Sequence, residues 1–364
     1  NHGLVLETED YEPKQIATVS YTFATADAAS EEPAKAFVPA PSKPTGPDGD
    51  FYLYLTESQA MSVSTSETTI QPGYYGAKTI KIAATDLADS GASSIYYEAF
   101  KKIMDQDIKF KAKWKNVSSD NANAALDTTY EYDIRIIGLL QDYANESRTA
   151  FAGITFQFAD NGLTYSYRQN NVDNNSTGWE NSELRGRMNA PGWEDSSVMT
   201  YGDAEAKGSI WARAPKVIQD NVQPVYKLTH NAAGNTMTAV SPTRDQLFLA
   251  SYAEMVASTS TYYTDSTWVA SYNNNWLKDE GVKGTVYQYW KAKNISGKTS
   301  NDFMVKKAQA SAAPTDTGWS AGNWWERSTR PARTDRILHV YRAGDPYHSY
   351  EPTTNFTVVP CFCF

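Results

Sequence analysis

The sequence predicts an α+β fold in which strands predominate and helices are short. Runs of Val, Ile, Phe, Tyr and Thr, residues that favour strands, recur along the chain. Only a few segments space their apolar residues three and four apart, as a helix with one buried face requires. With 364 residues, 13% of them aromatic, the chain exceeds the ~150 residues of a typical domain, and a large core is expected.

Residues 1–50 are predicted to form an extended arm and spacer. The best strand candidate within it covers residues 16–23. Residues 24–50 are rich in proline, which excludes a helix or a central strand. These prolines are Pro33, Pro39, Pro41, Pro44 and Pro47. Two interpretations stay open for the arm: a disordered tail, or a strand that docks on a neighbouring subunit.

Residues 51–130 are predicted to be β-rich, either as a small domain or as the first sheet of one large domain. Strands are expected at 51–55, 79–83 and 108–114. Residues 94–104 are predicted to form a short amphipathic helix. Its apolar side consists of Tyr97, Phe100, Ile103 and Met104.

Residues 131–364 carry the remaining elements. Strands are expected at 132–138, 155–158 and 246–250, with a terminal strand at 357–364. A helix is predicted at 181–188, capped by Asn181 or Ser182, and a second at about 204–213. A helical turn with Glu254 and Met255 should follow the strand at 246–250, and residues 262–275 have the composition of a surface loop.

Charge and composition argue against several classes of protein. The chain has 33 basic and 42 acidic residues, a net charge of −9, which disfavours general nucleic-acid binding. It contains no apolar run near the ~20 residues of a membrane span, so no membrane insertion is expected. Its two cysteines, Cys361 and Cys363, stand two positions apart and cannot bridge each other without severe strain.

An ordered set of six motifs carries a family resemblance. The motifs are GWENSELR at 178–185 with MN at 188–189, VQPVYK at 222–227, DQLFLAS at 245–251 with Glu254, WWERS at 324–328, Gly344, and VVPCF at 358–362. Together they resemble an uncharacterised domain family of bacterial surface proteins and bacteriophage virion proteins, over about residues 131–364. The final third is similar to the C-type-lectin-like fold, shared with formylglycine-generating enzymes and phage receptor-binding proteins. The resemblance therefore implies a C-type-lectin-like domain at 131–364.

Most residues of these motifs are interpreted as structural. Large apolar side chains at element junctions usually anchor a core. Such residues here are Trp179, Phe248, Trp324 and Trp325. Arg185 and Arg327 are expected to tie loops to carboxylates or carbonyls, and Gly344 to provide a turn with positive φ. The two cysteines are expected to be buried thiols that pack as small apolar residues.

The segment between the tryptophan pair and the terminal strand is the predicted binding site. The resemblance implies that it forms exposed strands and loops, where phage receptor-binding relatives carry their variable face. Tyrosine offers rigid contact area, and arginine and histidine add directional donors, so glycan and protein receptors both fit. The alternative is an ordinary polar hairpin. The predicted ligand-binding residues are Arg330, Arg333, Asp335, Arg336, Tyr341, Tyr347, His348 and Tyr350.

The sequence gives little support for catalysis or metal binding. The four histidines lack metal-ligand spacing. Calcium-dependent lectins of the resembling fold use Glu-Pro-Asn and Trp-Asn-Asp sequences, whereas this chain has only Glu351-Pro352-Thr353. Formylglycine-generating enzymes hold copper with paired cysteines, but Cys361 and Cys363 are predicted on the final core strand. We therefore expect no catalytic residues, no metal and no cofactor.

The predicted function is that of a non-enzymatic, externally displayed binding protein. The resemblance points to a bacteriophage virion component, such as a tail, head-fibre or receptor-binding protein, at the virion surface or in the extracellular space. Its expected partners are a host-surface glycan or protein and, through the arm, other virion proteins or further copies of itself in a homo-oligomer. Two alternatives remain: a capsid-decorating or filament-forming subunit, and a secreted bacterial adhesin.

Overall fold

A computed structural model shows a mixed α+β fold built on several antiparallel sheets. The structure describes residues 42–88, 94–116, 128–176, 178–193, 209–231, 240–256, 277, 280–281, 286–295, 297, 300–309, 314–330 and 333–364. The predicted strand at 16–23, the loop at 262–275 and the first half of the helix at about 204–213 lie outside these residues. The predicted α+β class is confirmed, and the C-type-lectin-like topology stays a prediction.

The described strands form a six-stranded sheet, a three-stranded sheet and two two-stranded sheets. The strand order of the largest sheet is β13-β5-β4-β3-β1-β2, and that of the three-stranded sheet is β10-β11-β12. The strands are β1 (Phe51–Leu55), β2 (Gly73–Gly76), β3 (Phe110–Lys115), β4 (Thr129–Leu139), β5 (Ile154–Phe158), β6 (Val225–His230), β7 (Val240–Asp245), β8 (Lys306–Ala308), β9 (Ser320–Gly322), β10 (Trp324–Thr329), β11 (Ile337–Val340), β12 (His348–Tyr350) and β13 (Cys361–Cys363).

The largest sheet joins both ends of the described chain through one aromatic face. Alternate residues of neighbouring strands meet there, because side chains along a strand point to opposite faces. Phe156 stacks on its cross-strand partner Phe362 at 5.2 Å, and Phe51 lies edge-on to Phe364 at 5.2 Å. Residue 130 lies within β4, so the sheet spans the boundary predicted between residues 130 and 131.

The described helices are short and surround these sheets. The α-helices are α1 (Glu57–Val63), α2 (Ala77–Ile80), α3 (Ala84–Ala88), α4 (Ile95–Asp105), α5 (Glu183–Met188), α7 (Ile210–Arg213), α8 (Lys216–Asn221), α9 (Tyr252–Met255) and α13 (Gln288–Lys293). Three 3-10 turns are described as well: η1 (Gly46–Asp50), η2 (Trp179–Asn181) and η4 (Asp302–Met304).

The predicted helix near residue 94 is confirmed as α4. Ser94 caps it by accepting a hydrogen bond from the backbone N–H of Tyr97 at 3.2 Å. Phe100 and Ile103 are buried, as the apolar spacing predicted, whereas Tyr97 is only half-buried. The helix predicted at 181–188 begins later, at Glu183 with Ser182 as its cap, because the preceding residues form the turn η2.

Two strand predictions are wrong. Residues 77–80 form α2, whose turn brings Ala77 and Ile80, three positions apart, into the core. Residues 246–250 are buried but irregular, and Phe248 makes only one antiparallel bridge, to Cys361. This apolar run is buried in the core, although no strand pairs with it along its length.

The predicted ends of the chain also need correction. The terminal strand is shorter than residues 357–364, because only β13 pairs with β5. Residues 42–50 are not a free spacer. Lys43 forms a 3.4 Å ion pair with Glu131, and η1 leads directly into the edge region of the largest sheet, where Gly49 is buried.

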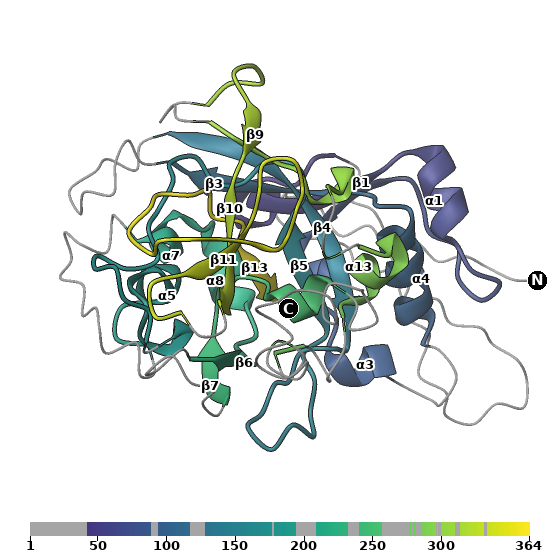
Figure 1. Cartoon of the computed structure of the whole chain (residues 1–364). Helices are drawn as coiled ribbons and strands as arrows, with labels where there is room; N and C mark the ends of the chain where they lie inside the picture. The colour runs from purple at the N-terminus through teal and green to yellow at the C-terminus, as the bar shows by residue number, and fades with distance from the viewer. Residues whose placement is uncertain are drawn as a thin grey trace, which may run out of the picture.

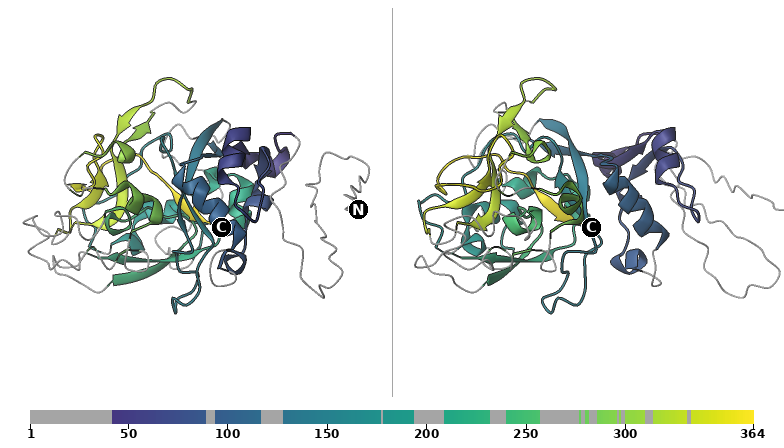
Figure 2. Two further views of the ribbon diagram at one scale, coloured as in Figure 1. Left: turned by 90° about the vertical axis from the view of Figure 1, so that its right-hand side faces the viewer. Right: turned by 45° about the vertical axis from the view of Figure 1, so that its right-hand side comes forward.

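Figures 1 and 2 show how these parts are arranged. Helices α1, α3 and α4 lie on the opposite side of the molecule from the three-stranded sheet β10-β11-β12. The terminal strand β13 runs inside the molecule beside β5, between these two sides (Figure 1).

Candidate functional site

The predicted binding residues lie on and beside the hairpin of β11 and β12. In this hairpin His348 is opposite His339, and Tyr350 is opposite Ile337. The side chains of His348 and Tyr350 therefore point to the same face of the sheet, and that of Ser349 points to the other. Arg330 donates a hydrogen bond to the Ser349 hydroxyl at 3.3 Å. The strand register thus places Arg330 apart from Tyr350, although the sequence predicted both for one site.

Four of the predicted residues form an aromatic patch. The rings of Tyr347 and Tyr341 lie 4.7 Å and 4.9 Å from the ring of His348. Tyr350 lies 5.6 Å from Phe356 and is 49% exposed. The patch therefore presents tyrosine surface to solvent within a group of neighbouring rings.

Buried and partly buried rings pack against this patch. His339 lies 4.6 Å from Phe356 and 6.1 Å from Trp325, and is only 3% exposed. Burial, with a smaller effect of His348, lowers the pKa of His339 to about 3. Burial also lowers the pKa of His348. Both imidazoles are thus neutral at neutral pH, and the patch carries no histidine cation.

Three of the other predicted residues, Arg333, Asp335 and Arg336, form a charged cluster beside the patch. Arg333 bonds both carboxylate oxygens of Asp335, at 2.7 and 2.5 Å, and these bonds with Arg333 are the main reason that the pKa of Asp335 is lowered. Arg336 forms ion pairs with Asp335 at 3.5 Å and with Glu351 at 3.2 Å. Two guanidinium groups thus face two carboxylates. We call the aromatic patch and this cluster together the hairpin face.

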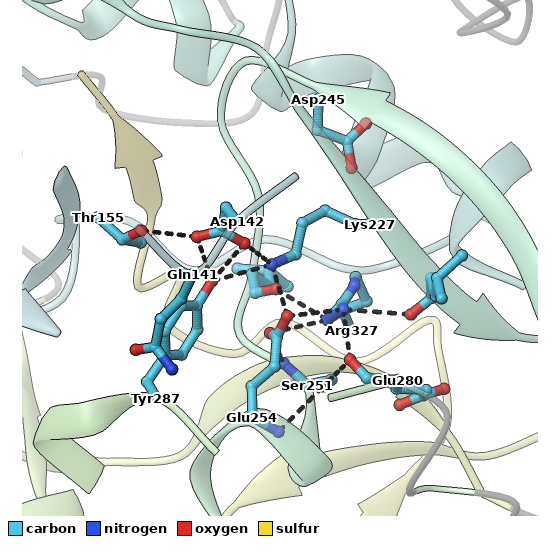
Figure 3. Close-up of polar contacts among 12 residues, drawn as sticks. Gln141, Asp142, Thr155, Lys227, Asp245, Ser251, Glu254, Glu280, Tyr287 and Arg327 are labelled. Carbon is cyan, nitrogen blue, oxygen red and sulfur yellow. Dashed lines mark hydrogen bonds and ion pairs between the residues drawn. The ribbon is translucent and has the colours of Figure 1, made fainter. Parts of the chain in front are cut away.

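A second concentration of functional groups, which the sequence did not predict, is enclosed in the core (Figure 3). Lys227 on β6 lies 2.6 Å from Asp142 and 2.5 Å from Glu254. Glu254 on α9 also receives two hydrogen bonds from Arg327, each 3.1 Å long. Tyr287 donates to Asp142 at 2.8 Å. Two cations and two carboxylates thereby compensate one another in the interior, as buried charges require.

This buried network fixes the protonation of its members. Burial alone would raise the pKa of Asp142, but Lys227 and the hydroxyls of Thr155 and Tyr287 together hold it below its usual value. Burial opposes the charge of Lys227 in the same way, and Asp142 and Glu254 outweigh it and raise the lysine pKa. Both groups therefore stay ionised.

Two further carboxyl groups beside the network are held towards the neutral form. Burial raises the pKa of Glu280 to about 7, against the effects of Arg327 and the Ser328 hydroxyl. Burial, reinforced by Glu280, raises the pKa of Glu326 well above its usual value. Within the described part of the chain, neither carboxyl oxygen of Glu326 has a hydrogen-bond partner. Glu326 is therefore a neutral, unsatisfied group of the core.

The cysteines are buried, as expected, but their surroundings are polar. Cys363 lies 3.4 Å from the Thr155 hydroxyl and 3.5 Å from the Asp142 carboxylate. Burial raises the pKa of both Cys361 and Cys363. Both are thus thiols rather than thiolates at neutral pH, and the thiolate is the form that attacks or binds a metal. Among the residues described, no three His, Cys, Asp or Glu side chains gather as a metal site would need.

The motif arginines and tryptophans have the structural roles that the sequence predicted. Arg185 binds Asp245 at 2.7 Å, and Trp179 donates to the same carboxylate at 2.8 Å. Arg327 binds Glu254, while Trp325 and its neighbour Trp324 are fully buried. Lys227, Glu254 and Arg327 all occur in the motifs, but nothing in the sequence indicated that Asp142 meets them.

No family model, curated protein or solved structure matches this chain. None of the helices in the described part of the chain has the length and apolarity needed to cross a membrane.

Proposed function

We propose that this chain is a non-enzymatic binding protein displayed outside the cell, as a component of a bacteriophage virion. Its hairpin face recognises a host-surface glycan or protein. The observation that carries the proposal is the group of neighbouring rings in the aromatic patch, which exposes Tyr350 to solvent next to Phe356, and Phe356 in turn contacts the buried rings of His339 and Trp325. Rigid aromatic groups lose little entropy on binding, which suits them to recognition.

The charge of the hairpin face narrows the ligand class. Arg333 and Arg336 are already paired with Asp335 and Glu351, so the face has no excess charge. A strongly acidic ligand would have to displace these carboxylates. A neutral sugar face, or a polar protein surface without strong charge, can stack on the tyrosines and leave the ion pairs in place.

The core supports a binding role better than a catalytic one. The ionisable groups around Lys227 are enclosed, and their charges compensate within the fold. The proposal therefore assigns them to stability. We also propose that residues 131–364 form a C-type-lectin-like domain, as the resemblance implies.

Binding of the labelled chain to arrayed bacterial surface polysaccharides and to intact cells of several bacterial species tests the proposal. A double variant, Arg333→Ala with Tyr350→Ala, should lose binding with an unchanged melting temperature. A control double variant alters exposed residues elsewhere, Arg148→Ala with Tyr54→Ala, and should bind normally. Equal binding by both variants, or no binding to any cell or polysaccharide, would contradict the proposal.

A further inference from the structure

A groove of about 710 Å³ lies between the outer face of β3 and the helices α7 and α8. Its volume falls within the range of ~300–1,000 Å³ that is usual for ligand pockets. It is separate from the hairpin face, and none of the predicted ligand-binding residues lines it. Its lining includes Asp50, Lys113, Lys115, Trp211, Lys216 and Gln219.

The groove is basic on an acidic chain. Three lysines and one aspartate line it, whereas the whole chain has a net charge of −9. Lys113 lies 3.3 Å from Asp50, and Lys216 pairs with Asp220 one helical turn away. Lys115 is exposed and has no ion-pair partner among the described residues. The lining therefore presents an excess of positive charge.

The paired lysines remain available to an acidic ligand. The side chains of Lys113 and Asp50 are each 38% exposed, and those of Lys216 and Asp220 are more exposed still. Ion pairs this exposed contribute only about 0–1 kcal/mol. A ligand with several negative groups can thus compete for both lysines while it also binds Lys115.

The walls of the groove offer an aromatic surface and a free acceptor. Trp211 is partly exposed and packs on the core, so its ring is held in place. Gln219 donates through Nε2 to the carbonyls of Trp211 and Ala214, at 2.9 and 3.1 Å. Its Oε1 has no donor among the described residues, and a ligand hydroxyl can supply one.

Arg213 holds the two sides of the groove together. This buried side chain on α7 donates to the carbonyl of Lys115 at 2.9 Å and to the carbonyl of Thr164 at 3.0 Å. The end of β3 and helix α7 are thereby fixed relative to each other. A site held in this way loses little conformational entropy on binding.

We propose that the groove binds an acidic oligosaccharide whose sugar units carry carboxylates. The lysines pair with the carboxylates, Trp211 packs against a sugar face, and Gln219 accepts from a hydroxyl. An acidic ligand is preferred to a neutral one because the lining has more lysines than carboxylates. This site is additional to the hairpin face and does not depend on it.

Isothermal titration with oligogalacturonates, which are chains of a uronic acid, tests the proposal on the full chain. Neutral maltooligosaccharides, a poly-glutamate peptide and inorganic phosphate serve as comparison ligands. We expect the oligogalacturonates alone to bind, with an affinity that falls as salt is added. Binding by maltooligosaccharide alone, by the peptide alone, or by phosphate as tightly as by the uronic acid would overturn the proposal, as would no binding of the oligogalacturonates.

Variants locate the site. Lys115→Glu with Lys216→Glu should weaken oligogalacturonate binding roughly tenfold or more, a loss of about 1.4 kcal/mol. The matched control reverses two exposed lysines on and beside α2, Lys78→Glu with Lys81→Glu, and should leave the affinity unchanged. Trp211→Leu keeps an apolar side chain and should also weaken binding. Equal affinities in the two lysine variants would refute this location, and the melting temperature of each variant shows that it has folded.

Discussion

Glu280→Gln is the substitution that tests the buried network most directly. The Glu280 carboxyl is enclosed in the core, where it accepts a hydrogen bond from the backbone N–H of His230 at 2.9 Å and another from the Ser328 hydroxyl. Glutamine has nearly the same shape and cannot ionise. Its carbonyl can accept from His230, and its amide can donate to Ser328.

The sign of the effect follows from proton binding. Burial raises the pKa of Glu280 from 4.5 to about 7 in the folded protein. Between these values the folded state keeps the proton that the unfolded chain has released, so stability falls as pH rises, and the loss is complete above about pH 7. At about 1.4 kcal/mol per pH unit, the loss amounts to about 3 kcal/mol of unfolding free energy.

Urea denaturation followed by tryptophan fluorescence measures this loss. Between about pH 4 and pH 8 the wild-type chain should lose about 3 kcal/mol more unfolding free energy than the Glu280→Gln variant. Groups that titrate in both proteins cancel in this difference. Glu67→Gln, at an exposed position, is the control and should follow the wild type. Parallel profiles for wild type and Glu280→Gln would refute the assignment of Glu280 as a group protonated by burial.

Three other substitutions test the core and the support of the hairpin face. Arg185→Met should lower the unfolding free energy in urea by about 3–5 kcal/mol, because the Asp245 carboxylate stays buried without its cationic partner. A smaller loss would contradict this role of the ion pair. Gly344→Ala should cost about 1–3 kcal/mol, because φ is 86° and a Cβ would lie 2.1 Å from a backbone carbonyl oxygen. Gly46 also has positive φ, but the space around its Cβ position is open. Gly46→Ala should therefore lower the unfolding free energy less than Gly344→Ala does in the same assay. In the wild type, the free energy of unfolding should fall as pH falls from 6.5 towards about 3, because the unfolded chain binds a proton on His339 before the folded chain does. Melting curves of His339→Gln should lack this dependence of stability on pH. An unchanged dependence would exclude His339 as its source.

Local patterns in the sequence predicted many of the elements. The apolar spacing predicted α4, and runs of residues that favour strands predicted β1, β3, β4 and β5. The pattern failed at residues 79–83, because two isoleucines there suit a strand as well as a helical turn. Such short runs are ambiguous, and packing of Ala77 with Ile80 decided the outcome.

The sequence predicted only in part which residues of the binding site lie together. Residues close in the chain were expected to act together, and the hairpin does bring Tyr347 and His348 into contact. Arg330 was assigned to the same group, but its bond to Ser349 places it on the other face of the sheet. The groove at Trp211 was missed, because its walls come from β3 and from helices about a hundred positions later.

Periodicity, caps, charge balance and composition are properties of neighbouring residues, so the sequence alone determined the α+β class, the positions of β1, β3, β4 and β5, and the acidic character of the chain. Which charges meet was decided only by tertiary structure. Asp142, Lys227 and Glu254 come from separate segments, and their hydrogen bonds exist only after the core has enclosed them. Removal from water is what makes such pairing obligatory, and the sequence does not record which distant partners share that environment.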